Sequence, residues 1–131
     1  MDQSVGMVLV VDDDPDVREG LELLLGRHGY PVVTAADGTE ALDRLRSQPL
    51  PSLILLDLMM PTMNGMELES RLKSDPLWSK IPIVVITGAG ARVADRVSAM
   101  RLEVIPKPFD IPLLLAAVSR WCRPAPGNAG G

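Results

Sequence analysis

The sequence predicts a three-layer α/β domain, in which a doubly wound, five-stranded parallel sheet is covered by helices on both faces. Three observations support this: five short apolar runs, the amphipathic segments between them, and a length of 131 residues, which suits one ordinary domain. We expect this domain to occupy residues 1–123. Residues 124–131, rich in Pro, Gly and Ala, are expected to form a disordered tail or the start of a linker.

The five apolar runs are interpreted as the strands. They are rich in Val, Ile and Leu and do not alternate with polar residues, which is typical of strands buried on both faces. The runs are Met7–Val11, Val32–Ala35, Leu53–Leu56, Ile81–Ile86 and Leu102–Ile105.

The first three helices are predicted from their capping residues. Asp14 followed by Pro15 marks a helix start, and the apolar residues at helical spacing end at Gly26 and Gly29. The second and third helices each begin with a capping residue three positions before a Glu, as in a capping box. These pairs are Asp37 with Glu40 and Asn64 with Glu67.

The last two helices are predicted from apolar spacing. The fourth is marked by Val93, Val97 and Met100, and Asp110 caps the fifth. The buried stripe of the fifth is expected to contain Ile111, Leu114, Leu115, Val118 and Cys122. A second apolar row on this helix has two interpretations, a cover for the helix end or a face that binds a partner or a second copy. This row is Leu113, Ala117 and Trp121.

Composition excludes several classes of protein. A formal net charge of -4 argues against a nucleic-acid binder, because phosphate contacts require an excess of Lys and Arg. The chain has a single cysteine, Cys122, which excludes an internal disulfide. Its side chain is expected to be buried and to pack in the core. No signal peptide and no bilayer-length apolar run is found, so we expect a cytoplasmic protein without membrane association.

Polar residues follow four of the five predicted strands. Asp12, Asp13 and Asp14 follow the first, Asp57 the third, Thr87 the fourth and Lys107 the fifth, and functional groups of open parallel sheets gather at such carboxyl ends. Asp14 is the helix cap. Crowded carboxylates repel one another unless a cation lies among them, and oxygen ligands suit Mg²⁺.

These residue types also suit phosphoryl transfer. The carboxylate of Asp57 can attack phosphorus and form an aspartyl phosphate. Lys107 is a suitable cation and Thr87 a suitable hydroxyl donor for the phosphoryl oxygens.

Four ordered motifs resemble the response-regulator receiver domain of two-component signalling, over about residues 7–122. They are VLVVDDDP, LILLDLMMPTMNG, VVITG and PKPFD. The resemblance implies a flavodoxin-like topology and phosphorylation of Asp57 by a histidine kinase or a phosphotransfer protein. It also implies contacts from Thr87 and Lys107 to the phosphoryl oxygens, and a cis bond before Pro108. The implied Mg²⁺ ligands are Asp12, Asp13, Asp57 and the backbone carbonyl of Met59.

The resemblance further implies a signalling domain that promotes its own phosphotransfer and dephosphorylation, rather than an enzyme. Its implied partners are the phosphodonor and a downstream protein or output domain, with a homodimer as a further state. Two positions depart from the family pattern. Val104 stands where a Tyr or Phe is usual, and Met100 and Arg101 replace a common Gly-Ala pair.

Three alternative functions are less consistent with the sequence. An aspartyl phosphatase of the haloacid-dehalogenase type needs a second Asp two residues after the nucleophile, where this chain has Met59. A nucleotide-binding domain needs a glycine-rich turn after the first strand, where this chain has three aspartates. A receiver that binds partners without phosphorylation is disfavoured, because the acidic residues, Thr87 and Lys107 are all present.

Overall fold

The computed structural model describes residues 6–47, 49–58, 65–88 and 103–122. Within them lies one parallel sheet with the strand order β2-β1-β3-β4-β5. The strands are β1 (Val8–Val11), β2 (Val32–Ala35), β3 (Leu53–Leu56), β4 (Ile83–Thr87) and β5 (Glu103–Pro106). This confirms the predicted five-stranded, doubly wound sheet. β2 and β3 have the predicted bounds, whereas β4 and β5 each extend one residue further toward the carboxyl edge than predicted.

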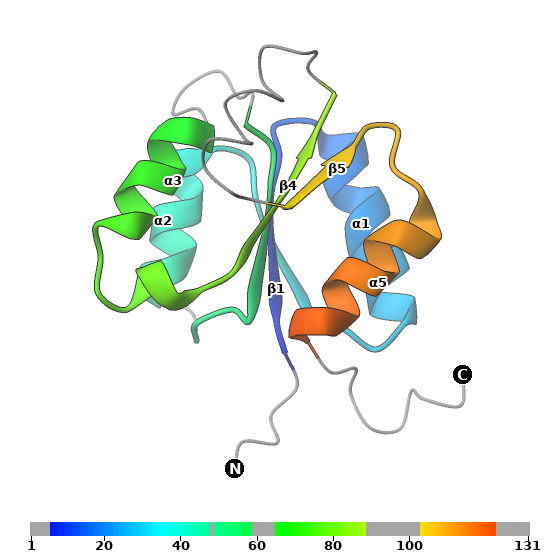
Figure 1. Ribbon diagram of the computed structural model, residues 1–131, viewed down its shortest axis with the longest axis horizontal. Helices are drawn as coiled ribbons and strands as arrows, with labels where there is room; N and C mark the ends of the chain where they lie inside the picture. Colours follow the sequence, from blue (N-terminus) through cyan, green and yellow to red (C-terminus); the bar gives the residue numbers. More distant parts are fainter. Residues whose placement is uncertain (1–5, 48, 59–64, 89–102, 123–131) are drawn as a thin grey trace.

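Helices cover both faces of the sheet, as predicted. Figure 1 shows α2 and α3 over one face and α1 and α5 over the other. The helices are α1 (Pro15–Arg27), α2 (Gly38–Ser47), α3 (Gly65–Lys73) and α5 (Ile111–Trp121), with a short 3₁₀ turn, η1 (Trp78–Lys80). The fourth predicted helix, with Val93, Val97 and Met100, lies outside the described residues.

Capping residues explain where α1 and α2 begin. The carboxylate of Asp14 accepts a hydrogen bond from the backbone N–H of Asp16, which satisfies one of the otherwise unpaired donors at the helix start. At α2, Asp37 accepts from the N–H of Glu40 at 2.8 Å, and Glu40 accepts in return from the N–H of Ala36. This reciprocal pair confirms the predicted capping box, with the return bond one residue earlier than usual.

The end of α1 and the start of α5 also follow the predicted signals. After α1 the chain turns at Gly29, whose φ of 88° favours glycine because it has no Cβ. Asp110 caps α5 by accepting from the N–H of Leu113. Asn64, predicted to cap α3, lies outside the described residues.

The sheet divides the core into two apolar clusters. Alternate residues of β1 and β3 point to opposite faces, so Leu9 and Ile54 pack toward α2 and α3 while Val10 and Leu55 pack toward α1 and α5. All residues of both strands are buried, which explains their continuous apolar sequences. Trp78 packs against the cluster beneath α2 and α3.

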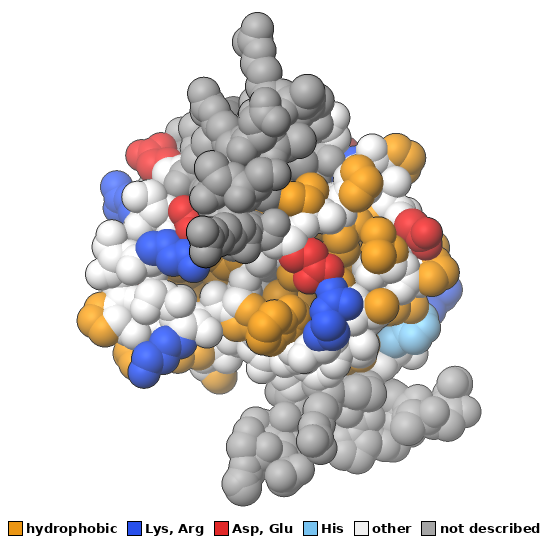
Figure 2. Space-filling view, viewed as in Figure 1, with side chains coloured by type: hydrophobic (Ala, Val, Ile, Leu, Met, Phe, Trp, Pro, Cys, Tyr) orange, Lys and Arg blue, Asp and Glu red, His pale blue; other side chains and the backbone are white. Residues whose placement is uncertain are grey.

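The prediction for α5 was wrong at Ile111 and at Ala117. Ile111, expected in the buried stripe, is 48% exposed, and Figure 2 shows apolar side chains at the surface over this helix. Ala117, expected in a second surface row with Leu113 and Trp121, is fully buried, whereas those two side chains are exposed. Ala117 follows Leu114 by three residues, so it shares the helix face that Leu114 and Val118 bury against the sheet.

Cys122 is buried at the end of α5, as predicted, and lies against the start of β1. A Cβ added to Gly6 would come within 2.9 Å of the Cys122 Cα, which leaves room only for glycine. Burial raises the pKa of the Cys122 thiol from 9.0 to about 11, and burial, with the nearby Cys122, also raises the pKa of Tyr30. The thiol therefore stays protonated at neutral pH.

We expect alkylation of Cys122 by iodoacetamide at pH 9 to be at least about tenfold slower in the folded protein than in urea, because the thiolate is the nucleophile. A thiol pKa raised by folding stabilises the protein below pH 9, and this stabilisation is lost as the pH rises through about 11. The free energy of unfolding should fall less steeply over that range in Cys122→Ala. Equal alkylation rates, or an unchanged pH dependence in the variant, would contradict the prediction.

Candidate functional site

The register of the sheet brings Asp12 and Asp57 together. Val11 pairs with Leu56, so the residues that follow these two central strands emerge side by side at the carboxyl edge. The Asp57 N–H donates to the Val11 carbonyl at 2.9 Å, and the Asp12 N–H donates to the Ala35 carbonyl at 3.1 Å. Both side chains are buried, with Asp12 2% and Asp57 5% exposed.

Lys107 reaches these two carboxylates from the end of β5. Its Nζ donates to Asp12 Oδ2 at 2.7 Å and to Asp57 Oδ2 at 3.3 Å. Its peptide bond to Pro108 is cis, as the resemblance implied. One ammonium group therefore bridges two buried carboxylates that come from different strands.

The charge of Lys107 is favoured by its partners. Burial alone lowers the pKa of this lysine, but its hydrogen bonds and charge interactions with Asp12 and Asp57 outweigh burial and raise the pKa above its usual value. The side chain is 23% exposed. The ammonium group is consequently charged throughout the neutral pH range.

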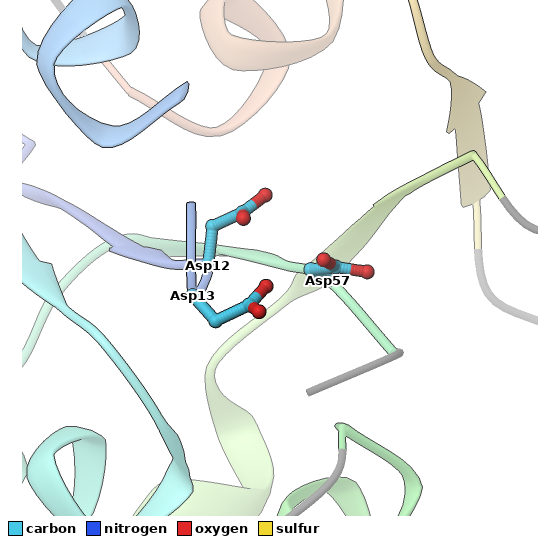
Figure 3. A group of neighbouring side chains, drawn as sticks. All are labelled: Asp12, Asp13 and Asp57. Carbon is cyan, nitrogen blue, oxygen red and sulfur yellow. The ribbon is translucent and has the colours of Figure 1, made fainter. Parts of the chain in front are cut away.

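Asp13 completes a group of three carboxylates. Figure 3 shows Asp12 and Asp13 at the end of β1, with their carboxylates turned toward the side on which Asp57 lies. One oxygen from each of the three residues lies within 4.8 Å of the others, and Asp13 is exposed to solvent. An all-oxygen donor set of this kind fits a hard divalent cation such as Mg²⁺. Such a cation would also reduce the repulsion among the three carboxylates, of which only Asp12 and Asp57 pair with Lys107.

The structure also places the remaining predicted residues. Asp14 is directed to the α1 N-terminus rather than to the carboxylate group. Thr87 is the last residue of β4 and pairs with Pro106, directly before Lys107. Met59 lies outside the described residues. Val104, at the usual aromatic position, is 37% exposed on β5.

Arg18 is a residue of this site that the sequence analysis did not identify. Its Nη1 donates to the backbone carbonyl of Asp12 at 2.7 Å from the second turn of α1. An arginine on an amphipathic helix ordinarily indicates a solvated face, so the sequence carries no signal for this contact.

The strand order and the acidic site with its lysine are typical of doubly wound α/β domains of flavodoxin-like topology that carry their functional groups at the carboxyl edge of the sheet. The family model of the response regulator receiver domain matches residues 8–119. The chain belongs to this family, and as a receiver domain of response regulators it is a phosphoacceptor signalling module. The phosphatase and nucleotide-binding alternatives find no support in these matches.

Curated relatives and solved structures agree with this assignment. The response regulator MprA of Mycobacterium avium is 41% identical over 119 residues, which cover 88% of this chain and 50% of MprA. An uncharacterized 14.6 kDa protein of Leptolyngbya boryana is 38% identical over 125 residues, 93% of this chain and 94% of that protein. The chain thus spans half the length of MprA and nearly all of the Leptolyngbya protein.

Among solved structures, a response regulator receiver protein from Pseudomonas putida superposes with a TM-score of 0.82 at 30% identity, covering 91% of this chain and 99% of that one. In the described part of the chain, no helix has both the length and the apolar character that crossing a bilayer requires.

Proposed function

We propose that Asp57 is the residue that accepts the phosphoryl group, from a histidine kinase or a phosphotransfer protein. An Asp57 carboxylate oxygen forms a bond to phosphorus, and the bond from phosphorus to the donor nitrogen breaks with its electron pair leaving on that nitrogen. The product is an aspartyl phosphate. The observation that supports this assignment best is Lys107, whose ammonium lies 3.3 Å from Asp57 Oδ2 and is suitably placed to neutralise charge on the transferring group.

The described contacts of Asp12 and Asp13 suit these two carboxylates to roles other than that of the acceptor. Both oxygens of Asp12 accept described hydrogen bonds, Oδ1 from the Asp14 N–H at 2.9 Å and Oδ2 from Lys107 at 2.7 Å. These bonds fix the Asp12 carboxylate and suit a residue that holds a cation. Asp13 has no ion pair with Lys107, so it lacks the adjacent cation that the Asp57 carboxylate has.

Mg²⁺ is the proposed cofactor. Asp12, Asp13 and Asp57 would hold it together with the Met59 carbonyl, and the bound ion would supply positive charge to the phosphoryl oxygens. Thr87 is proposed to contact one of the same oxygens from the end of β4. The residues of the domain would thereby promote both phosphotransfer and the later hydrolysis of the aspartyl phosphate.

Phosphorylation is proposed to shift the domain between two conformations that differ in affinity for a downstream protein, an output domain or a second copy of the chain. Because Val104 replaces the usual aromatic residue, we infer that this shift does not depend on an aromatic rotamer at β5. The proposed setting is the cytoplasm, and a net charge of -4 disfavours direct binding of nucleic acid.

Acetyl phosphate provides the direct test, because it phosphorylates an acceptor aspartate without a kinase. In the presence of Mg²⁺, intact-protein mass spectrometry should show the addition of one phosphoryl group. The modification should be absent with EDTA and should be removed by hydroxylamine, which cleaves acyl phosphates. No mass increase, or a modification that resists hydroxylamine, would contradict the proposed function.

A further inference from the structure

We propose that Arg18 is a positioning residue for the cation site: its guanidinium holds the β1–α1 turn, residues 12–14, so that Asp13 faces Asp12 and Asp57. The inference deepens the proposed function and rests on it, because Mg²⁺ is the cation that the positioned carboxylates would bind. It concerns a contact from α1 to a backbone carbonyl at the end of β1, rather than to one of the carboxylates.

Two contacts tie Arg18 to this turn. Its side-chain Nη1 donates to the Asp12 carbonyl at 2.7 Å, and its backbone N–H donates to the Asp14 carbonyl at 3.1 Å. The side-chain bond involves a charged donor and a half-buried residue, so it is stronger than an exposed neutral bond. One residue of α1 therefore fixes both ends of the turn.

The Asp12 carbonyl matters because it belongs to the peptide unit that leads into Asp13. This peptide unit is planar and includes the Asp13 N and Cα. When Arg18 holds the carbonyl oxygen, it therefore also fixes the orientation of the N–Cα bond of Asp13. The Asp13 carboxylate is exposed and makes no hydrogen bond or ion pair with another described residue. Its place near Asp12 and Asp57 therefore depends on the backbone of the turn (Figure 3).

The positive charge of Arg18 and its proposed positioning role predict opposite changes in Mg²⁺ affinity when the side chain is removed. The guanidinium is a positive charge near the cation site, so electrostatics alone predicts tighter Mg²⁺ binding when it is removed. Loss of the hydrogen bond to Asp12 predicts weaker binding, because groups that orient metal ligands typically contribute 10–100-fold to affinity. The direction of the change in Kd therefore separates the two roles.

The experiment measures the Mg²⁺ Kd by isothermal titration calorimetry in Arg18→Met, Arg18→Lys and the control Arg27→Met. Arg27 lies in the last turn of α1, about 13 Å further along the helix, and its loss removes the same charge. We expect Arg18→Met to raise the Kd about tenfold. Arg18→Lys, which keeps the charge and one donor, should raise it less, and Arg27→Met should leave it unchanged.

A double-mutant cycle with Asp13→Asn tests whether Arg18 acts through Asp13. The Kd increases caused by Arg18→Met and Asp13→Asn should be less than multiplicative, because a misplaced Asp13 is already largely lost as a ligand. Multiplicative effects, or a Kd for Arg18→Met equal to or below that of the wild type, would overturn the proposal. If Arg18→Met does not fold, a Kd for Arg18→Lys at or below the wild-type value would overturn it instead.

A metal-free measurement separates this inference from the proposed function. The Asp14 N–H donates to Asp12 Oδ1 at 2.9 Å within the turn, so its hydrogen exchange should be several-fold faster in Arg18→Met than in the wild type or Arg27→Met. Unchanged exchange would overturn the positioning role. Wild-type protein that fails to bind Mg²⁺, with faster Asp14 exchange in Arg18→Met, would refute the cation site and leave the structural role of Arg18 intact.

Discussion

Asp57→Asn is expected to abolish phosphorylation by acetyl phosphate and Mg²⁺, lowering the initial rate by more than about 1,000-fold. The amide is nearly the same size as the carboxylate but is a far weaker nucleophile, and it no longer attracts Lys107 as an ion pair at 3.3 Å. Intact-protein mass spectrometry over a time course measures the effect. The far-UV circular dichroism should match that of the wild type, because the substitution conserves volume.

Asp43→Asn provides the matched control. Asp43 makes an exposed ion pair with Arg46 at 3.4 Å on α2, and its side chain is 70% exposed. The same chemical change at this position should leave the phosphorylation rate within about twofold of the wild type. Full phosphorylation of Asp57→Asn would show that another residue is the acceptor and would refute the assignment.

Lys107→Met is expected to destabilise the metal-free protein by about 2–3 kcal/mol, because removing one partner of a buried ion pair leaves the other charge uncompensated. Here the loss leaves two carboxylates, Asp12 and Asp57, facing each other while both are almost fully buried. This value lies at and below the lower end of the usual range of about 3–5 kcal/mol because the lysine side chain is 23% exposed. Urea unfolding in EDTA measures the change in the free energy of unfolding.

Two comparisons sharpen this prediction. Lys80→Met removes the same charge from an exposed residue of η1 and should change stability by less than about 0.5 kcal/mol. Mg²⁺ should recover much of the loss in Lys107→Met, because a bound cation restores positive charge between the carboxylates. Phosphorylation should still be slowed about 100-fold, because the cation that faces the phosphoryl group is missing. Equal stability of the two lysine variants in EDTA would refute the role given to Lys107.

Buried carboxylates that repel each other lie at one edge of an otherwise apolar sheet. Asp12 and Asp57 are buried directly after β1 and β3, whose residues are all Val, Ile or Leu, and both pair with a single lysine. Burying like charges opposes folding, so this edge is a place where binding of a cation or a phosphoryl group can change stability and conformation. We therefore infer that the proposed signalling depends on the same charge imbalance that is expected to make Lys107→Met less stable.

Local sequence patterns were sufficient to predict the layers of this domain and the residue types at its site. Continuous apolar runs such as Leu53–Leu56 identify a strand buried on both faces without any knowledge of its neighbours, because burial on both sides removes the need for alternation. Asp14 and Asp37 cap helices through bonds that span two or three residues, so their roles are also readable locally. The rule that functional groups follow the carboxyl ends of parallel strands then placed Asp12, Asp57 and Lys107 at one edge.

Which of these groups contact one another at that edge depends on the folded arrangement of the strands and helices. Lys107 contacts Asp12 across 95 residues of sequence, and the distances to Asp12 and Asp57 depend on strand order and register, which no local pattern specifies. The bond from Arg18 to the Asp12 carbonyl likewise depends on how α1 packs against β1. The apolar spacing of α5 left its buried face uncertain by about one residue position, and packing against the sheet buried Ala117 and exposed Ile111. Periodicity gives the width of an apolar face, whereas its orientation is set by contacts with the sheet that it covers.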